Sequence, residues 1–374
     1  MKCIINAKLI LDDKIVEGKR LYFDTQIVKI TEEIAYEEAE IIDAKHAYVS
    51  AGFIDLHIHG SGGVDVMDAS PEALEQLSLT LLETGTTSFL ATTMTMSTDA
   101  IENALHNVQL YGSEVSGANI LGIHLEGPFI NPDKHGAQDK NHIQSPNIAF
   151  IEPYMQEIKM ITLAPEVAGA ERFIKYIKEA YPHIILSIGH SDASYEKSKE
   201  SFSWGVSHAT HLFNAMNPYH HRKPGIVGAV FEGDVTCDII PDLIHTHPST
   251  LELVHSMKRE KLILITDAMR AGCMKCGDYD LGGRSVQVSE GKALLEDGTL
   301  AGSVLKMNEA LFNMTQHTSM GLVDVVNAVT TLPAEMLGVK KGALKEGYDA
   351  DIIFFDKNFS IVLTIIKGKV KYRS

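Results

Sequence analysis

One pattern repeats through most of the chain: a short apolar segment suited to a buried strand is followed by a segment with the apolar spacing of a helix. The helical segment that begins at Ser70–Pro71, for example, has an N-cap residue followed by a first-turn proline. Eight such units predict an α/β fold, a (β/α)8 TIM barrel. The predicted strands are GFIDLHI (52–58), TTSFLAT (86–92), NILGIHLEG (119–127), MITLAPE (160–166), IILSIGH (184–190), GVSHATH (205–211), VTCDIIPD (235–242) and LILITDA (262–268).

Both ends of the chain are rich in predicted β-strands. Because chain termini often lie close together, the two ends are expected to build one small β-sandwich domain from residues 1–50 plus 345–374. The barrel would then be the catalytic domain and occupy residues 51–344. The glycine-rich segment 269–283, after the last predicted strand, is expected to be a surface connection or a mobile loop.

The charge of the chain limits its partners. With 49 acidic and 33 basic residues the formal net charge is −16, which argues against nucleic-acid binding but leaves room for a local positive pocket that holds a small anion. No apolar run is long enough for a membrane helix, so no membrane partner is expected. Only four cysteines are present, which favours a reducing, cytoplasmic location.

Histidines and carboxylates gather at the ends of the predicted strands, where a barrel of this kind places its active site. His57 and His59 alternate along one strand and therefore point to the same side. Imidazole and carboxylate are ligands for zinc, iron and manganese, so the set predicts a metal site. The strand-end residues are His57, His59, His124, Glu126, Glu166, His190, His208, His211, Asp242, His245, His247 and Asp267.

Individual members of this set differ in their expected roles. Glu126, His190 and His211 are interpreted as ligands. For Glu126 the reason is that an unpaired buried carboxylate at a strand end would be costly, and a structural ion pair is the alternative. His208 is expected to support a ligand or to be a packed histidine, and for His124 both roles remain open.

Asp267 ends an otherwise apolar strand and would face the site. Metal-dependent hydrolysis needs a base that takes a proton from water and returns it to the leaving group, and a carboxylate near the metal can do both. Asp267 is therefore the predicted general base, with a further metal ligand or a helix cap as the alternatives.

Several motifs together resemble those of the N-acetylglucosamine-6-phosphate deacetylases, a family within the amidohydrolase superfamily. The resemblance covers residues 48–310 and the C-terminal segment GALKEGYDADIIFFD, and HLEGPF, THLFNAM and GTLAGS are its most specific parts. The remaining motifs are GFIDLHIHG, IGHSDAS, IIPDLIHTHP and ITDAM.

The resemblance implies a TIM barrel with a β-sandwich from both termini, a homodimer, and one or two divalent metals (zinc, iron or manganese) per subunit. It places the principal metal ligands at Glu126, His190 and His211 and the catalytic carboxylate at Asp267. Because His57 and His59 are retained, a second metal bridged by Glu126 is expected when metal is plentiful. The implied substrate contacts are Ala137, Gln138, Asn214, Ala215, Arg222, His245, Leu300, Ala301, Gly302 and Ser303.

The implied reaction is hydrolysis of the acetamide of N-acetyl-D-glucosamine 6-phosphate to D-glucosamine 6-phosphate and acetate, a step of amino-sugar catabolism. A metal-bound water would be the nucleophile, and Asp267 would act as general base and then as general acid. Arg222 and His245 are the expected phosphate binders, and Arg222 is expected to serve its own or a neighbouring subunit's site. The alternatives are the epimeric N-acetylgalactosamine 6-phosphate, a cyclic-amide substrate, and a metal-binding protein without catalysis.

Overall fold

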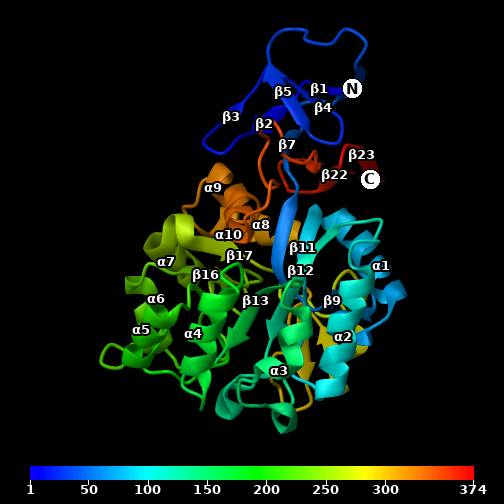
Figure 1. Ribbon diagram of the computed structural model, residues 1–374. Helices are drawn as coiled ribbons and strands as arrows, with labels where there is room; N and C mark the ends of the chain where they lie inside the picture. Colours follow the sequence, from blue (N-terminus) through cyan, green and yellow to red (C-terminus); the bar gives the residue numbers. More distant parts are fainter.

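Eight parallel strands form the central sheet of the computed structural model, which describes residues 1–374 (Figure 1). They pair in chain order, and a parallel bridge between Ile58 and Ala268 joins the first strand to the segment after the last. The sheet is therefore nearly closed, which confirms the predicted (β/α)8 barrel. Its strands are β8 (Phe53–Ile58), β11 (Thr86–Thr92), β12 (Asn119–Glu126), β13 (Ile158–Leu163), β14 (Ile185–Ile188), β15 (His208–Ala209), β16 (Thr236–Ile239) and β17 (Leu262–Leu264).

The barrel strands are apolar on both faces because both faces are covered. All six residues of β8 and all seven of β11 are buried, as expected for a parallel sheet with helices outside and packed side chains inside. The strands β14 to β17 are shorter than predicted, although residues just beyond them still donate backbone hydrogen bonds to the neighbouring strand, as Thr210 does to Ile188 and Ile265 to Ile239.

Helices surround the barrel on the outside (Figure 1). The predicted start of the first one is confirmed: the Ser70 side chain accepts a hydrogen bond from the backbone N–H of Ala73, with Pro71 in the first turn. The helices are α1 (Pro71–Thr80), α2 (Thr98–Tyr111), α3 (Ile148–Ile151), α4 (Ala170–Ala180), α5 (Tyr195–Trp204), α6 (Gly225–Glu232), α7 (Pro248–Lys258), α8 (Met307–His317), α9 (Leu322–Asn327) and α10 (Thr331–Leu337). None of them is long and apolar enough to cross a membrane.

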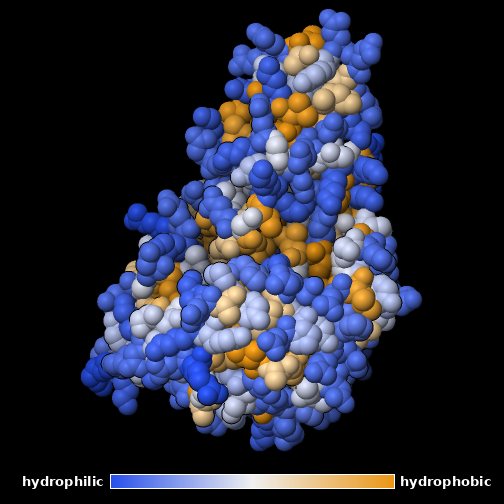
Figure 2. Space-filling view, viewed as in Figure 1, coloured by the Kyte–Doolittle hydropathy of each residue, from blue (hydrophilic) through white to orange (hydrophobic).

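Strands from the two ends of the chain pair with one another in a smaller part above the barrel (Figure 1). A four-stranded sheet has the order β5-β4-β1-β6, and a six-stranded sheet has the order β23-β22-β21-β7-β2-β3. In the view of Figure 2, hydrophobic residues gather where this narrower part joins the barrel. The strands are β1 (Lys2–Ile5), β2 (Lys8–Ile10), β3 (Ile15–Val16), β4 (Arg20–Phe23), β5 (Ile27–Thr31), β6 (Glu40–Asp43), β7 (Tyr48–Ala51), β21 (Ile352–Phe355), β22 (Ile361–Ile366) and β23 (Lys369–Arg373).

A third small sheet lies between the last barrel strand and α8. It consists of β18 (Gly277–Leu281), β19 (Arg284–Ser289) and β20 (Lys292–Leu295), and its inner face packs Leu281, Val286 and Leu295 into a core of its own. The expectation of a loop over 269–283 was therefore wrong for its second half. Alternation in "RSVQVS" places Val286 and Val288 on one buried face and polar residues on the other. A short pair, β9 (Gly60–Ser61) and β10 (Val64–Asp65), follows β8.

Candidate metal centre and active site

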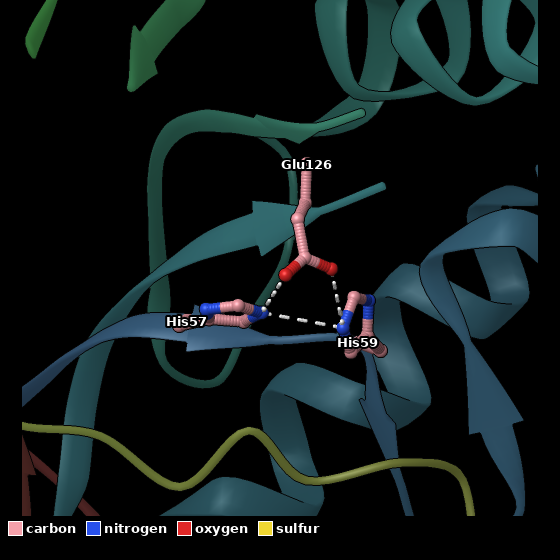
Figure 3. A group of neighbouring side chains, drawn as sticks. All are labelled: His57, His59 and Glu126. Carbon is pink, nitrogen blue, oxygen red and sulfur yellow. Dashed lines mark hydrogen bonds and ion pairs between the residues drawn. The ribbon is translucent and has the colours of Figure 1, made fainter. Parts of the chain in front are cut away.

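The two histidines at the end of β8 point at the carboxylate at the end of β12 (Figure 3). Nε2 of His57 lies 3.5 Å from Oε1 of Glu126, and Nε2 of His59 lies 3.4 Å from Oε2. The two Nε2 atoms are 3.3 Å apart. The alternation of the strand therefore brings both imidazoles to one point, as the sequence predicted.

A second group uses the same carboxylate. Nε2 of His190 and Nε2 of His211 each lie 3.0 Å from Oε1 of Glu126, and they are 3.1 Å from each other. His190 follows β14 and His211 follows β15, and both have left-handed backbones with φ of 47° and 32°. Such conformations are costly for residues other than glycine and are concentrated at functional sites.

Asp267 joins the cluster from the segment after β17, which pairs with β8 where the barrel closes. Its Oδ1 lies 3.4 Å from Nε2 of His57 and 3.3 Å from Nε2 of His59. Its backbone is also left-handed, with φ of 49°, and its N–H donates to the carbonyl of His57 at 2.9 Å. The structure thus places the predicted base within reach of the pair of histidines on β8.

The donor atoms fit a divalent metal. Within each of the two groups, His57–His59–Glu126 and Glu126–His190–His211, one ligand atom per residue lies within 4.8 Å of the others, and all of these residues are buried. Imidazole nitrogens that converge on one another and on a carboxylate repel unless a proton or a cation lies between them. Imidazole and carboxylate are the ligands of zinc, iron and manganese, and Glu126 is common to both groups.

The histidines of the cluster stabilise the ionised forms of its two carboxylates. Burial would raise the pKa of Glu126, but His57 and His190 outweigh it and hold that pKa well below its usual value. Burial likewise opposes ionisation of Asp267, yet His57 and His59 lower its pKa to about 2. Burial would lower the pKa of His211, but Glu126 raises it to about 9. The two carboxylates are therefore ionised at neutral pH and are ready to bind a cation.

Contacts to the second nitrogen of an imidazole fix the orientation of two of the candidate ligands. Nδ1 of His190 lies 2.9 Å from the carbonyl of Lys134, and Nδ1 of His59 lies 3.3 Å from the carbonyl of Thr92. Such contacts set the tautomer and the ring orientation of a metal ligand.

Both ring nitrogens of His124 contact groups outside the two sets of candidate ligands. Its Nδ1 lies 3.1 Å from the carbonyl of Leu56, its Nε2 lies 2.7 Å from the Thr162 hydroxyl, and burial holds its pKa well below its usual value. With both ring nitrogens engaged, His124 is not a ligand in this arrangement. It packs edge-on against His57, with ring centroids 4.6 Å apart.

A pocket of about 200 Å³ opens onto this cluster. The candidate residues that line it are His59, Glu126, Ala137, Gln138, His190, His211, Asn214, Ala215, His245, Asp267, Leu300 and Gly302. Ala301 and Ser303 are instead buried behind it, where the Ser303 hydroxyl contacts the carbonyl of Thr266. The structure also adds wall residues that the motifs did not indicate, Met94 and Leu281 among them.

Gln138 is held rigidly inside the pocket. Its Oε1 accepts from the backbone N–H of Thr95 at 2.8 Å, and its Nε2 donates to Oε2 of Glu126 at 2.8 Å. The amide proposed as a substrate contact is thus directed at a candidate metal ligand. His245 is held in a similar way, since Nδ1 of its ring lies 2.7 Å from Oδ2 of Asp242.

Arg222 lies outside this pocket. It belongs to an exposed surface hollow with Asp192, Tyr195 and His220, and its guanidinium contacts His221. Within one chain, therefore, His245 is the one predicted phosphate binder that the pocket contains.

Glu166, after β13, joins two loops of the site. It accepts from Nδ2 of Asn131 at 2.8 Å and from the hydroxyl of Ser191 at 2.7 Å, next to His190. Its position at a strand end was the only sequence signal for it, and that signal does not separate a ligand from a residue that ties loops together.

Several named proteins are similar to the chain in sequence. The chain is 40% identical over 359 residues to an N-acetylglucosamine-6-phosphate deacetylase of Lysinibacillus sphaericus, with 94% of this chain and 92% of the relative covered. It is 43% identical over 336 residues to one of Bacillus subtilis (strain 168), with 86% and 84% covered. An N-acetylgalactosamine-6-phosphate deacetylase of Escherichia coli O157:H7 is 33% identical over 326 residues, with 85% and 86% covered.

Solved structures show the same architecture over the whole chain. An N-acetylglucosamine-6-phosphate deacetylase from Pasteurella multocida superposes with a TM-score of 0.95 at 30% identity and covers 100% of both chains. A variant of the Mycobacterium smegmatis enzyme, in complex with N-acetyl-D-glucosamine-6-phosphate, has a TM-score of 0.91 at 25% identity and covers 99% of both chains. The amidohydrolase family model matches residues 48–371, and the chain belongs to the amidohydrolase family.

Proposed function

We propose that the chain is an N-acetylglucosamine-6-phosphate deacetylase, which hydrolyses the acetamide of N-acetyl-D-glucosamine 6-phosphate to D-glucosamine 6-phosphate and acetate. One observation carries the proposal: Glu126 is shared by two groups of candidate metal ligands, with the ionised Asp267 beside them at the floor of a pocket. The relatives that match most of the chain bear the same activity in their names.

A divalent metal bound by Glu126, His190 and His211 would polarise the acetamide carbonyl and make water a better nucleophile. Asp267 accepts a proton from the attacking water and returns it to the amine nitrogen as the C–N bond breaks. His245, held by Asp242, lies in the wall of the pocket, where it can donate to substrate oxygens. Gln138 is occupied by Thr95 and Glu126, so its contribution is to orient the carboxylate.

The donor residues around Glu126 also allow two metals to bind. His57 and His59, with Glu126 and Asp267, form a second set of donors, and the proposal is one metal at Glu126–His190–His211 and a second at the β8 histidines when metal is plentiful. In the two-metal state Asp267 would bind a metal as well as move the proton.

Phosphate recognition is proposed to need a second subunit. Because the pocket holds His245 but no Arg or Lys, Arg222 from a neighbouring subunit would supply the missing cation in a homodimer. The four cysteines are free, which supports a cytoplasmic location.

The substrate is tested by the rate of acetate release from three compounds: N-acetylglucosamine 6-phosphate, its galactosamine epimer and unphosphorylated N-acetylglucosamine. The proposal predicts the highest kcat/KM for the first. A higher value for the epimer would favour the activity that the Escherichia coli O157:H7 relative is named for, and hydrolysis of a cyclic amide instead of all three would overturn the proposal.

A further inference from the structure

A buried histidine–carboxylate pair lies beside the metal centre and takes no part in the proposed chemistry. His208, on β15, and Asp238, on β16, are both fully buried, and Nε2 of the histidine lies 2.8 Å from Oδ2 of the aspartate. Nδ1 of His208 lies 2.7 Å from the hydroxyl of Thr236, which donates to the carbonyl of Ser207 and so accepts from the histidine. One proton therefore lies between His208 and Asp238.

The other oxygen of Asp238 reaches a candidate metal ligand through the backbone. Oδ1 of Asp238 accepts a hydrogen bond from the N–H of His211, and the Asp238 carbonyl accepts from the N–H of Leu212 at 2.9 Å. His211 is held in a left-handed conformation with φ of 32°. A residue with a side chain keeps such a conformation only where its surroundings impose it.

His211 differs from His190 and His59 in how its ring is held. The rings of His190 and His59 are oriented by backbone carbonyls at Nδ1, at 2.9 Å and 3.3 Å. Nδ1 of His211 is buried and has no hydrogen-bond partner. Apart from the contacts of its Nε2 with Glu126 and His190, the direction of the His211 ring therefore depends on the backbone at its own residue, which Asp238 holds.

We infer that Asp238, held in place by His208, is a positioning residue: it orients the ring of His211 toward the metal. The inference rests on the proposed metal-dependent function. Residues that hold a metal ligand in place typically contribute ~10- to 100-fold to metal affinity. The loss of Asp238 is therefore expected to weaken metal binding itself, and not only the rate of the reaction.

The test compares Asp238→Ala and Asp238→Asn with a matched control, Asp351→Ala. The amide of Asp238→Asn can still accept from His211 and donate to His208. Asp351 is also buried, and its side chain also accepts a backbone hydrogen bond, from Lys367 at 2.7 Å. Its other carboxylate oxygen pairs with Lys341, and its backbone carbonyl accepts from the N–H of Gly52, at the opposite end of β8 from His57. For each full-length protein, the zinc dissociation constant is measured by competition with a chromophoric chelator, together with the thermal midpoint of the metal-free form.

The inference predicts that Asp238→Ala weakens zinc binding by ~10- to 100-fold, whereas the zinc dissociation constant of Asp238→Asn stays within about threefold of the wild-type value. Asp351→Ala is expected to lower the thermal midpoint without weakening zinc binding. Equal zinc affinity in Asp238→Ala and the wild type would overturn it, and so would an equal loss of zinc affinity in Asp351→Ala.

If Asp238→Ala does not fold, His208→Phe takes its place, and unchanged zinc affinity in that variant overturns the inference. A wild-type chain that binds zinc while Asp238→Ala binds it equally well overturns the inference alone, whereas a wild type that binds no metal overturns the proposed function too.

Discussion

Oδ1 of Asp267 lies 3.3 Å from Nε2 of His59, although one residue follows the last barrel strand and the other follows the first. The closure of the barrel produces this contact, because the N–H of Asp267 donates to the carbonyl of His57 and Ala268 bridges to Ile58. The predicted base and the pair of histidines are therefore positioned by the same strand pairing. Activity at this site depends on the closed barrel as well as on the individual side chains.

Replacement of the carboxylate tests the role of Asp267 directly. Asp267→Asn is expected to lower kcat by ~10²- to 10⁴-fold, because the amide cannot take the proton from water, while the group of Glu126, His190 and His211 still binds metal. Initial rates of acetate release and metal content are measured on the same sample, with Asp13→Asn, an exposed carboxylate, as the control. Near-normal turnover with metal bound would show that Asp267 is not the base.

Removal of the β8 histidines separates the one-metal from the two-metal arrangement. His57→Asn/His59→Asn is expected to lose one equivalent of metal and keep the other, whereas Glu126→Gln is expected to lose both, because Glu126 belongs to both groups. Elemental analysis after equilibration with excess metal and removal of the unbound ions gives the stoichiometry. An unchanged metal content in the double histidine variant would mean that the second group does not bind metal.

Arg222 provides a test of phosphate recognition across subunits. Arg222→Ala is expected to raise KM for N-acetylglucosamine 6-phosphate by ~10- to 100-fold, the effect of losing a charge-assisted hydrogen bond, with little change for the unphosphorylated sugar. Lys223→Ala, the neighbouring cation in the same exposed hollow, is the matched control. The assignment fails if both substrates lose activity equally.

An ion pair near the junction of the two parts gives a pH dependence of stability. Nζ of Lys341 lies 2.6 Å from Asp351 and 2.8 Å from Asp349. Burial alone would lower the pKa of Lys341, but Asp351 and Asp349 raise it above its usual value of 10.5. Lys341→Met is expected to lower the free energy of unfolding by about 3 kcal/mol at neutral pH, since it leaves a buried carboxylate without its partner.

The sign of this pH effect follows from the raised pKa. Because the folded state holds the proton of Lys341 more tightly than the unfolded state, its stabilisation is present below pH 10.5 and is lost as the pH rises through the folded pKa. Urea unfolding at about pH 8 and about pH 11 should therefore show a smaller gap between the wild type and Lys341→Met at the higher pH. A gap that stays constant or widens would contradict the ion-pair assignment.

The barrel could be predicted because each of its strands is a short apolar run. The segment 86–92, for example, was predicted as a strand and is β11 in the structure, since a strand buried on both faces needs apolar or small residues throughout. The site followed from the barrel, because its topology brings the strand ends together. His57, Glu126 and His211 could thus be grouped before any geometry was known.

Other features depend on contacts that a sequence pattern does not contain. The small sheet β18–β20 was not predicted because glycines at its turns, such as Gly282 with φ of 59°, gave it the composition of a loop. The support of His211 by Asp238 also stayed hidden, because Asp238 is an interior residue of β16 and the residue it supports follows a different strand, β15. Arg222 was a substrate contact implied by the resemblance, but it lies outside the pocket of its own chain.

The central claim, metal-dependent deacetylation at the Glu126 cluster, is tested most directly by acetate release from N-acetylglucosamine 6-phosphate before and after chelation. The purified protein should release acetate, lose that activity when metal is removed, and regain it when zinc, iron or manganese is added back. Failure to release acetate with each of the three metals, in protein that is folded and has bound metal, would contradict the account.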